Sequence, residues 1–170
     1  AQHKPEIVIN TTAYHVVDHC EDNPLQPFLV NVCAIKHLVT LCNEHNSVLV
    51  HFSTDYVFDG TKKTPYTEND VPNPLSVYGM SKFAGELMLQ RYCKKYFLIR
   101  SSGLYGVAGS SGKGGNFVET MIRLAKEGKP IRVVNDQVLT PTATKELARK
   151  VAQLIQTSQY GLYHITNNGE

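Results

Sequence analysis

Apolar and polar residues alternate along this chain in a way that predicts strands separated by helices. Short runs rich in β-branched and aromatic residues predict buried strands at 6–10, 48–53 and 97–102. Between the first two, apolar positions recur with the helical period from Pro24 to about Asn46. After the second, Ser76 is a typical N-cap for a helix from 77 to about 91. This order predicts an α/β fold with a parallel sheet and right-handed crossovers.

The C-terminal part of the chain continues with shorter elements. The pattern predicts two helices, one at 116–127 closed by Gly128 and one at 144–156 capped by Thr144. It also predicts two short strands, at 131–134 and 162–166. The Gly/Ser-rich segment 109–115 lacks the Gly-Lys-Ser/Thr ending of a phosphate-binding loop, and we interpret it as a surface connection.

Composition excludes several classes of protein. The chain has 170 residues, 42% of them hydrophobic and 19% charged, which is typical of one globular domain with a real core. A net charge of +2 is too small to indicate a nucleic-acid or membrane partner, and we expect neither. We also expect no apolar stretch of membrane-spanning length.

Cysteine and histidine positions argue against disulfides and metal. The four cysteines show no CxxC spacing, so we expect reduced thiols in a cytoplasmic protein. His15, Asp18, His19 and Cys20 have the spacing of ligands on one helix face, but no distant Cys or His pair would complete a tetrahedral site. We therefore expect an ordinary helix start there and no metal.

The candidate chemistry lies between the second strand and the helix after Ser76. Thr54 and Asp55 follow the strand's carboxyl end, which is where open α/β sheets bind ligands. Tyr78 and Lys82 are four residues apart, so both project from one helix face. A phenol beside an ammonium ionises more easily and can act as a general acid near neutral pH.

Four blocks around these residues resemble a known family. They are STDYVFDG at 53–60, NPLSVYGMSKFAGE at 73–86, NFVETM at 116–121 and DQVLTPT at 136–142. In this order they resemble the dTDP-4-dehydrorhamnose reductases, which are extended short-chain dehydrogenase/reductases, and the likeness runs from Pro5 to about Asn167. The resemblance implies a Rossmann-like, doubly wound sheet with part of a small C-terminal substrate region.

The resemblance also implies a reaction and the residues that perform it. The reaction is NADH- or NADPH-dependent reduction of the 4-keto group of a nucleotide-activated 6-deoxysugar. Tyr78 would protonate the carbonyl oxygen, and Thr54 would donate a hydrogen bond to the same oxygen. Lys82 would lower the pKa of Tyr78 and bond the nicotinamide ribose. Asp55 would hold a sugar hydroxyl, although a loop carboxylate that caps local N–H groups is an equal alternative.

Cofactor contacts are carried over to the loop after the first strand. In the resembled family this loop lies against the dinucleotide, which implies that Thr12, Ala13, Tyr14 and His15 are close to the cofactor. Asn31, on the helix that follows, would help hold the active-site backbone. From the sequence alone a surface-facing Asn31 is almost equally favoured.

Departures from the family pattern shape further expectations. Gly103 stands where the family usually has a Trp that lines the sugar-nucleotide pocket, and Leu139 replaces a Gly. No glycine-rich dinucleotide fingerprint occurs near residue 1, so we expect a fragment that is inactive alone and binds dinucleotide poorly. We expect residues 1–106 to form part of the NAD(P)-binding domain and 107–170 part of the substrate region, interleaved with the sheet.

Two other functions remain open. One is a non-catalytic regulatory or binding protein with the same fold, because fold does not fix function. The other is a sugar-nucleotide epimerase or dehydratase that uses the same Tyr and Lys, although the block STDYVFDG favours a reductase. The choice between NADH and NADPH, the nucleotide sugar, and whether the protein is a homodimer also stay open.

Overall fold

A four-stranded parallel sheet forms the centre of the protein. The computed structural model describes residues 3–108 and 116–169, so the connection expected at 109–115 lies outside the described residues. The strands, in spatial order, are β1 (Ile7–Asn10), β2 (Val48–Thr54), β3 (Tyr96–Ser101) and β6 (Gly161–His164). All three pairings are parallel. The predicted α/β fold is confirmed, and the first three strands lie within one residue of their expected bounds.

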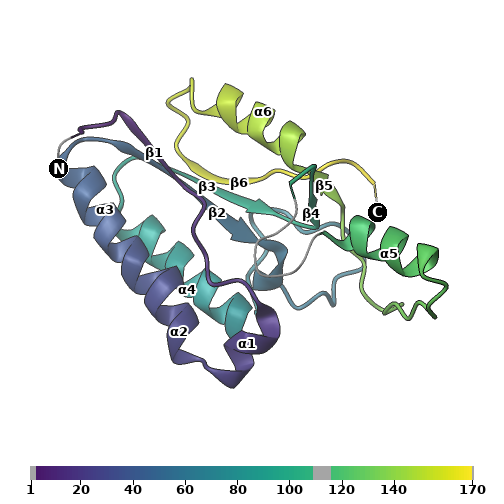
Figure 1. Ribbon diagram of the computed structural model, residues 1–170. Helices are drawn as coiled ribbons and strands as arrows, with labels where there is room; N and C mark the ends of the chain where they lie inside the picture. Colours follow the sequence, from purple (N-terminus) through teal and green to yellow (C-terminus); the bar gives the residue numbers. More distant parts are fainter. Residues whose placement is uncertain (1–2, 109–115, 170) are drawn as a thin grey trace.

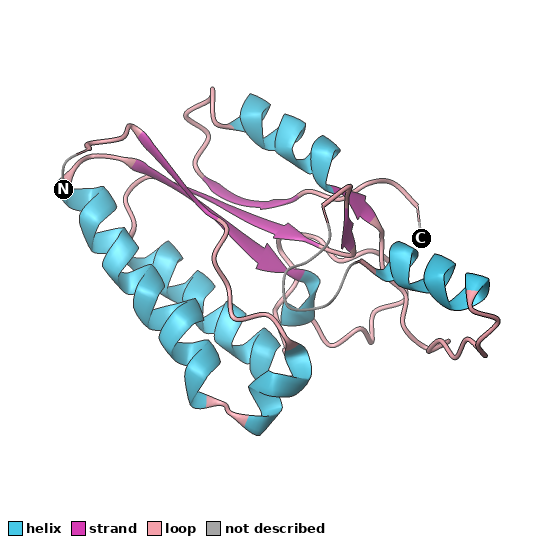
Figure 2. Ribbon diagram, in the orientation of Figure 1, coloured by secondary structure: helices cyan, strands magenta, loops and turns pink. Residues whose placement is uncertain are grey.

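Helices cover both faces of this sheet (Figure 1). One face carries α1 (Val17–Asp22), α2 (Leu25–Phe28), α3 (Ala34–Glu44) and α4 (Val77–Tyr92). The other face carries α6 (Thr144–Leu154), as Figure 2 also shows. Helix α5 (Phe117–Lys126) lies at one end of the molecule, and β4 (Leu104–Tyr105) and β5 (Thr142–Ala143) form a separate parallel pair.

Side-chain alternation along the strands builds two apolar cores. Leu49 and Leu98 point to one face. There they pack with residues of α3, of α4 and of the C-cap of α4, namely Ile35, Val39, Cys42, Leu89 and Cys93. Val50, Phe97 and Ile99 point to the other face and pack with Leu147 and Val151 of α6. The same alternation places His51 and Arg100 on the α4 face.

The long helix predicted from Pro24 runs from Leu25 to Glu44 and contains a π-helical turn, Leu29–Cys33, that the sequence pattern did not predict. This helix of 20 residues contains an 18-residue window with a mean hydropathy of 1.4, so contrary to expectation one helix of the described chain is long and apolar enough to span a membrane. This is weak evidence for a membrane segment, because core helices of globular domains pass the same test. Here Ile35, Val39 and Cys42 are buried in the core.

Helix α4 is fixed by a cap and by a close approach to the preceding helix. Ser76 Oγ accepts from the backbone N–H of Gly79 at 3.1 Å, which confirms the predicted N-cap. A Cβ on Gly85 would lie 2.2 Å from the backbone oxygen of Asn31. A glycine is therefore required for α4 to cross the π-helical turn at this distance.

Two expectations for the C-terminal part are wrong. Residues 131–134 form no strand and are exposed, although three β-branched residues among these four suggested one. Thr144 is the first helical residue of α6 and not its cap, because Ala143 holds the N-cap position without a side-chain hydrogen bond. By contrast α5 has the predicted range, with a capping box between Asn116 and Glu119.

Candidate functional site

The carboxyl end of β2 presents two of the predicted residues. Thr54 is the last residue of the strand, and Asp55 begins the 3₁₀ turn Asp55–Val57. Thr54 Oγ1 donates to Asp55 Oδ1 at 3.0 Å and accepts from the backbone N–H of Tyr56 at 3.2 Å. Burial raises the pKa of Asp55, against the lowering effect of the Thr54 hydroxyl.

Tyr78 lies in the first turn of α4, beside this strand end. Its ring meets the ring of Tyr56 edge-on, with centroids 5.5 Å apart. Burial raises the pKa of Tyr78 to about 12, and a hydrogen bond with the Thr54 side chain opposes that rise. Thr54 and Tyr78 are therefore brought together as predicted. The expected lowering of the Tyr78 pKa by Lys82 is not found, because burial dominates and the Asp55 charge adds to it.

Lys82 lies one helical turn further along α4 and is nearly inaccessible, with 2% of its surface exposed. Its ammonium nitrogen Nζ donates to the backbone oxygen of Phe52 at 2.7 Å and lies 3.4 Å from His51 Nε2. Burial lowers the pKa of Lys82 to about 8, while Glu86 acts in the opposite direction. The ammonium therefore still predominates at pH 7, but it is lost much nearer to neutral pH than for an ordinary lysine.

A buried polar chain connects Lys82 to the loop after β1. Asn10 Nδ2 donates to His51 Nδ1 at 3.0 Å. Asn10 Oδ1 accepts from the backbone N–H and from the hydroxyl of Thr12, at 3.1 and 2.7 Å. Neither Asn10 nor His51 was predicted from the sequence as part of the site. The available signal was a polar residue inside or at the end of each apolar strand.

Asn31 holds the loop that was expected to lie near the cofactor. Its side-chain amide bonds both the backbone N–H and the backbone oxygen of Tyr14, at 2.9 and 3.0 Å. It also donates to Ser81 Oγ of α4 at 2.9 Å. Asn31 is 1% exposed, so the surface-facing alternative is wrong. Of the other predicted loop residues, Ala13 and His15 are half-buried, with His15 Nδ1 3.4 Å from the Ala13 oxygen.

Gly103 follows β3 in a strained part of backbone space, with φ of +50°. A Cβ at this position would lie 2.5 Å from Leu139 Cδ1 and 3.0 Å from the Thr140 backbone oxygen. The two departures from the family pattern are therefore in contact. The Leu139 side chain therefore occupies the space that a larger side chain at residue 103 would need.

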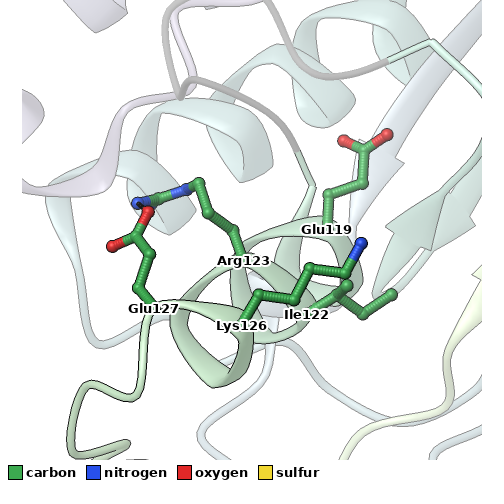
Figure 3. Close-up of a pocket in the computed structure, with 5 residues that line it drawn as sticks. All are labelled: Glu119, Ile122, Arg123, Lys126 and Glu127. Atoms are coloured by element: carbon green, nitrogen blue, oxygen red, sulfur yellow. Dashed lines mark hydrogen bonds and ion pairs between the residues drawn. The ribbon is translucent and has the colours of Figure 1, made fainter.

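Two surface cavities lie away from these residues. The first has a volume of 490 Å³. It is lined by side chains of α5 and its C-terminal cap, which Figure 3 draws: Glu119, Ile122, Arg123, Lys126 and Glu127. A second, of 650 Å³, lies among β4, α5 and the start of α6. Neither is lined by Thr54, Tyr78 or Lys82. Among the described residues no group of three His, Cys, Asp or Glu side chains is arranged to hold a metal ion.

Comparison with known proteins points to one family. The family model described as the RmlD substrate binding domain matches residues 1–170. The dTDP-4-dehydrorhamnose reductase of Escherichia coli K12 is 39% identical over 171 residues, which cover 98% of this chain and 56% of that protein. The reductase of Aggregatibacter actinomycetemcomitans is 40% identical and also covered over 56% of its length. The chain thus spans about half the length of the curated relatives it matches.

Solved structures agree with this comparison. The crystal structure of dTDP-4-dehydrorhamnose reductase from Bacillus anthracis, in complex with NADP, has a TM-score of 0.92 and 39% identity, covering 99% of this chain and 58% of that one. The Clostridium acetobutylicum reductase has a TM-score of 0.91 and 41% identity, over 99% of this chain and 58% of that one. A UDP-N-acetylglucosamine 4-epimerase from Methanobrevibacter ruminantium, 20% identical with a TM-score of 0.85, shares the fold.

Proposed function

The chain belongs to the RmlD substrate-binding-domain family, and from this premise we propose that the protein reduces the 4-keto group of a nucleotide-activated 6-deoxysugar with NADH or NADPH. One observation supports this reaction above the others. The hydroxyls of Thr54 and Tyr78 meet at the carboxyl end of β2, with Lys82 one turn further along α4. Two neighbouring hydroxyls suit a carbonyl oxygen that gains charge and then a proton, provided that the Thr54 proton turns from Asp55 Oδ1 to the substrate.

The donor set fits a reduced nicotinamide dinucleotide. Lys82 has three N–H donors, of which one is used on the Phe52 oxygen, so it can also bond ribose hydroxyls. The loop from Thr12 to His15, held by Asn31 against α4, offers a fixed backbone for the dinucleotide to lie against. When bound, the dinucleotide supplies the hydride that adds to the carbonyl carbon.

The chain's own residues supply the proton and the alignment. Thr54 positions the carbonyl oxygen, so that it faces the Tyr78 hydroxyl. Tyr78 then gives its proton to that oxygen. The raised pKa of Tyr78 keeps the phenol protonated at neutral pH, which is the form that an acid needs before the transfer. Asp55, at the edge of the same strand end, is placed to bond a sugar hydroxyl.

A turnover assay tests this proposal. The full-length protein should oxidise NADPH or NADH only when a dTDP-4-keto-6-deoxy sugar is present. Thr54→Val should lower turnover by about 10-fold to 100-fold with little change in the KM for dinucleotide, because it removes one donor to the oxygen. Thr40→Val is the matched control, since the Thr40 hydroxyl bonds only its own helix, to the Lys36 oxygen. Equal turnover in both variants would contradict the role given to Thr54.

The alternatives predict different assay results. An epimerase or dehydratase would convert a sugar nucleotide without net oxidation of added dinucleotide. A regulatory protein would bind dinucleotide or sugar nucleotide and turn neither over. Both alternatives could use the same Tyr78 and Lys82, so the assay distinguishes them from the proposed reduction where the geometry does not.

We extend the proposal to the setting of the reaction. Residues 1–106 would contact the dinucleotide and residues 107–170 the sugar nucleotide. The second part is interleaved with the first, because β6 is the fourth strand of the sheet and α6 packs on the sheet. The cytoplasm is the proposed location, with no nucleic-acid or membrane partner and a homodimer as the assembly to test. The cysteines support the proposed cytoplasmic location, because Cys20, Cys42 and Cys93 are buried as free thiols.

A further inference from the structure

His51 is a buried histidine that contacts Lys82 from β2. It is 1% exposed and lies on the α4 face of β2, between Asn10 on one side and Lys82 on the other. Each ring nitrogen faces one of these neighbours. The proton on the ring therefore decides which neighbour receives a hydrogen bond and which must give one.

The bonds around Asn10 determine where that proton lies. Asn10 Oδ1 accepts two donors from Thr12, the backbone N–H at 3.1 Å and the hydroxyl at 2.7 Å. A backbone N–H can only donate, so this atom of Asn10 is the oxygen and the atom facing His51 is the NH₂ group. The NH₂ group donates to His51 Nδ1 at 3.0 Å. Neutral His51 must then carry its proton on Nε2.

This tautomer directs an N–H group at Lys82. His51 Nε2 lies 3.4 Å from Lys82 Nζ. An ammonium has only donors, so it cannot accept this bond, whereas the lone pair of a neutral amine can. His51 itself stays neutral, because burial and the nearby Lys82 lower its pKa to about 3. The contact therefore favours the amine form of Lys82 over the ammonium form.

The other charges around Lys82 do not cancel this effect. The titratable groups that act on it are His51 from β2 and Glu86 from its own helix. Glu86 is engaged by Arg100 of β3, whose guanidinium lies 2.6 Å from Glu86 Oε2 in a fully buried ion pair. Lys82 thus has no carboxylate of its own among the described residues, and its one strong acceptor is the Phe52 oxygen.

We propose that His51, fixed by Asn10 in the Nε2–H tautomer, is a positioning residue that lowers the proton affinity of Lys82 and couples its charge to the Thr12 loop. If the function proposed above holds, His51 sets the pH above which the reductase loses the Lys82 ammonium. The direct test needs no activity, so it can fail or succeed independently of that function.

The test is an NMR titration of Lys82 in the full-length protein with ¹³C and ¹⁵N in its lysine side chains, the Lys82 signal being assigned by its loss in Lys82→Met. His51→Leu removes the N–H that faces the amine, so Lys82 should titrate about one pH unit higher than in the unchanged protein. His51→Gln is the conservative control. Its amide can accept from Asn10 and donate to Lys82, and the titration should stay near that of the unchanged protein.

The sign of the shift decides the matter. If His51 instead accepted a bond from the ammonium, His51→Leu would remove an acceptor and Lys82 would titrate lower. An unchanged or lower titration in His51→Leu therefore overturns the proposal. Should His51→Leu fail to fold, ¹⁵N spectra of histidine-labelled unchanged protein give a second decision. These spectra should show that Nε2 of His51 is protonated and that Nδ1 is unprotonated from pH 5 to 9. A proton on Nδ1 would overturn the proposal.

Discussion

The side-chain amide of Asn31 bonds both backbone groups of Tyr14, one at 2.9 Å and the other at 3.0 Å. Through a third bond, to Ser81 Oγ, the same amide reaches α4, and Ser81 Oγ donates in turn to the Tyr78 backbone oxygen. One buried side chain thus links the loop proposed to face the dinucleotide with the turn that carries the proposed acid.

Asn31→Ala should loosen this link. We expect the free energy of unfolding to fall by about 1–3 kcal/mol, because the backbone N–H and oxygen of Tyr14 lose their hydrogen-bond partner. The KM for dinucleotide should rise, since the loop is no longer held. Asn43→Ala is the matched control: it breaks bonds between the same long helix and the far end of α4, at Tyr92 and Lys94, and should leave the KM unchanged. An unchanged KM for dinucleotide in Asn31→Ala would show that Asn31 does not contribute to dinucleotide binding.

Lys82 should make stability depend on pH. Its pKa is lowered from 10.5 to about 8, so the stability that the buried amine contributes is present above the unfolded-state pKa and is lost as pH falls through the folded value. Between pH 9.5 and pH 7 this loss amounts to roughly 2 kcal/mol. Urea unfolding should show it in the unchanged protein and not in Lys82→Met. Parallel pH profiles for the two proteins would argue that Lys82 titrates normally.

Gly103→Ala should destabilise the protein through two effects. The left-handed φ of +50° costs about 1–2 kcal/mol for any residue with a Cβ, and that Cβ would lie 2.5 Å from Leu139 Cδ1. Gly60→Ala isolates the first effect, because Gly60 has φ of +72° with nothing within 4 Å of its Cβ position. The midpoint of thermal unfolding should be lower for Gly103→Ala than for Gly60→Ala. Adding Leu139→Ala to Gly103→Ala should recover part of the difference, because the Thr140 backbone oxygen still lies 3.0 Å from the Cβ position, and no recovery at all would rule out the contact with Leu139.

The ion pair between Glu86 and Arg100 offers a test of the buried charges. Arg100→Met leaves the Glu86 carboxylate, which has 0% exposure, without its cation, and should cost about 3–5 kcal/mol. The double variant Arg100→Met with Glu86→Leu removes the isolated charge, so most of that loss should be regained. If the double variant is as unstable as Arg100→Met in urea titrations, the carboxylate is not the cause.

Local signals account for what could be predicted. The strand bounds followed from the short apolar runs, and the start of α4 followed from Ser76, because a cap and a hydrophobic period are encoded within a few residues of where they act. The placement of Thr54 and Tyr78 at one sheet edge followed from the parallel order of the elements.

What could not be predicted depends on contacts between distant residues. His51 and Asn10 are 41 residues apart, and nothing local shows that they share a bond. The packing of Leu139 over Gly103 likewise arises only when the segment after α5 folds back onto the end of β3. The apolar run at 131–134 predicted a strand, but a strand needs a neighbour to pair with, and the described chain places none beside it.

The central claim is that Tyr78 gives the proton in a dinucleotide-dependent ketone reduction, and Tyr78→Phe tests it most directly. The change removes only a hydroxyl and keeps the ring that packs against Tyr56. Tyr92→Phe, at the exposed end of the same helix, is the control for loss of a phenol as such. In steady-state reduction of a dTDP-4-keto-6-deoxy sugar by the full-length protein, kcat should fall by about 10²-fold or more in Tyr78→Phe and stay unchanged in Tyr92→Phe. Full turnover in a folded Tyr78→Phe variant would contradict the account.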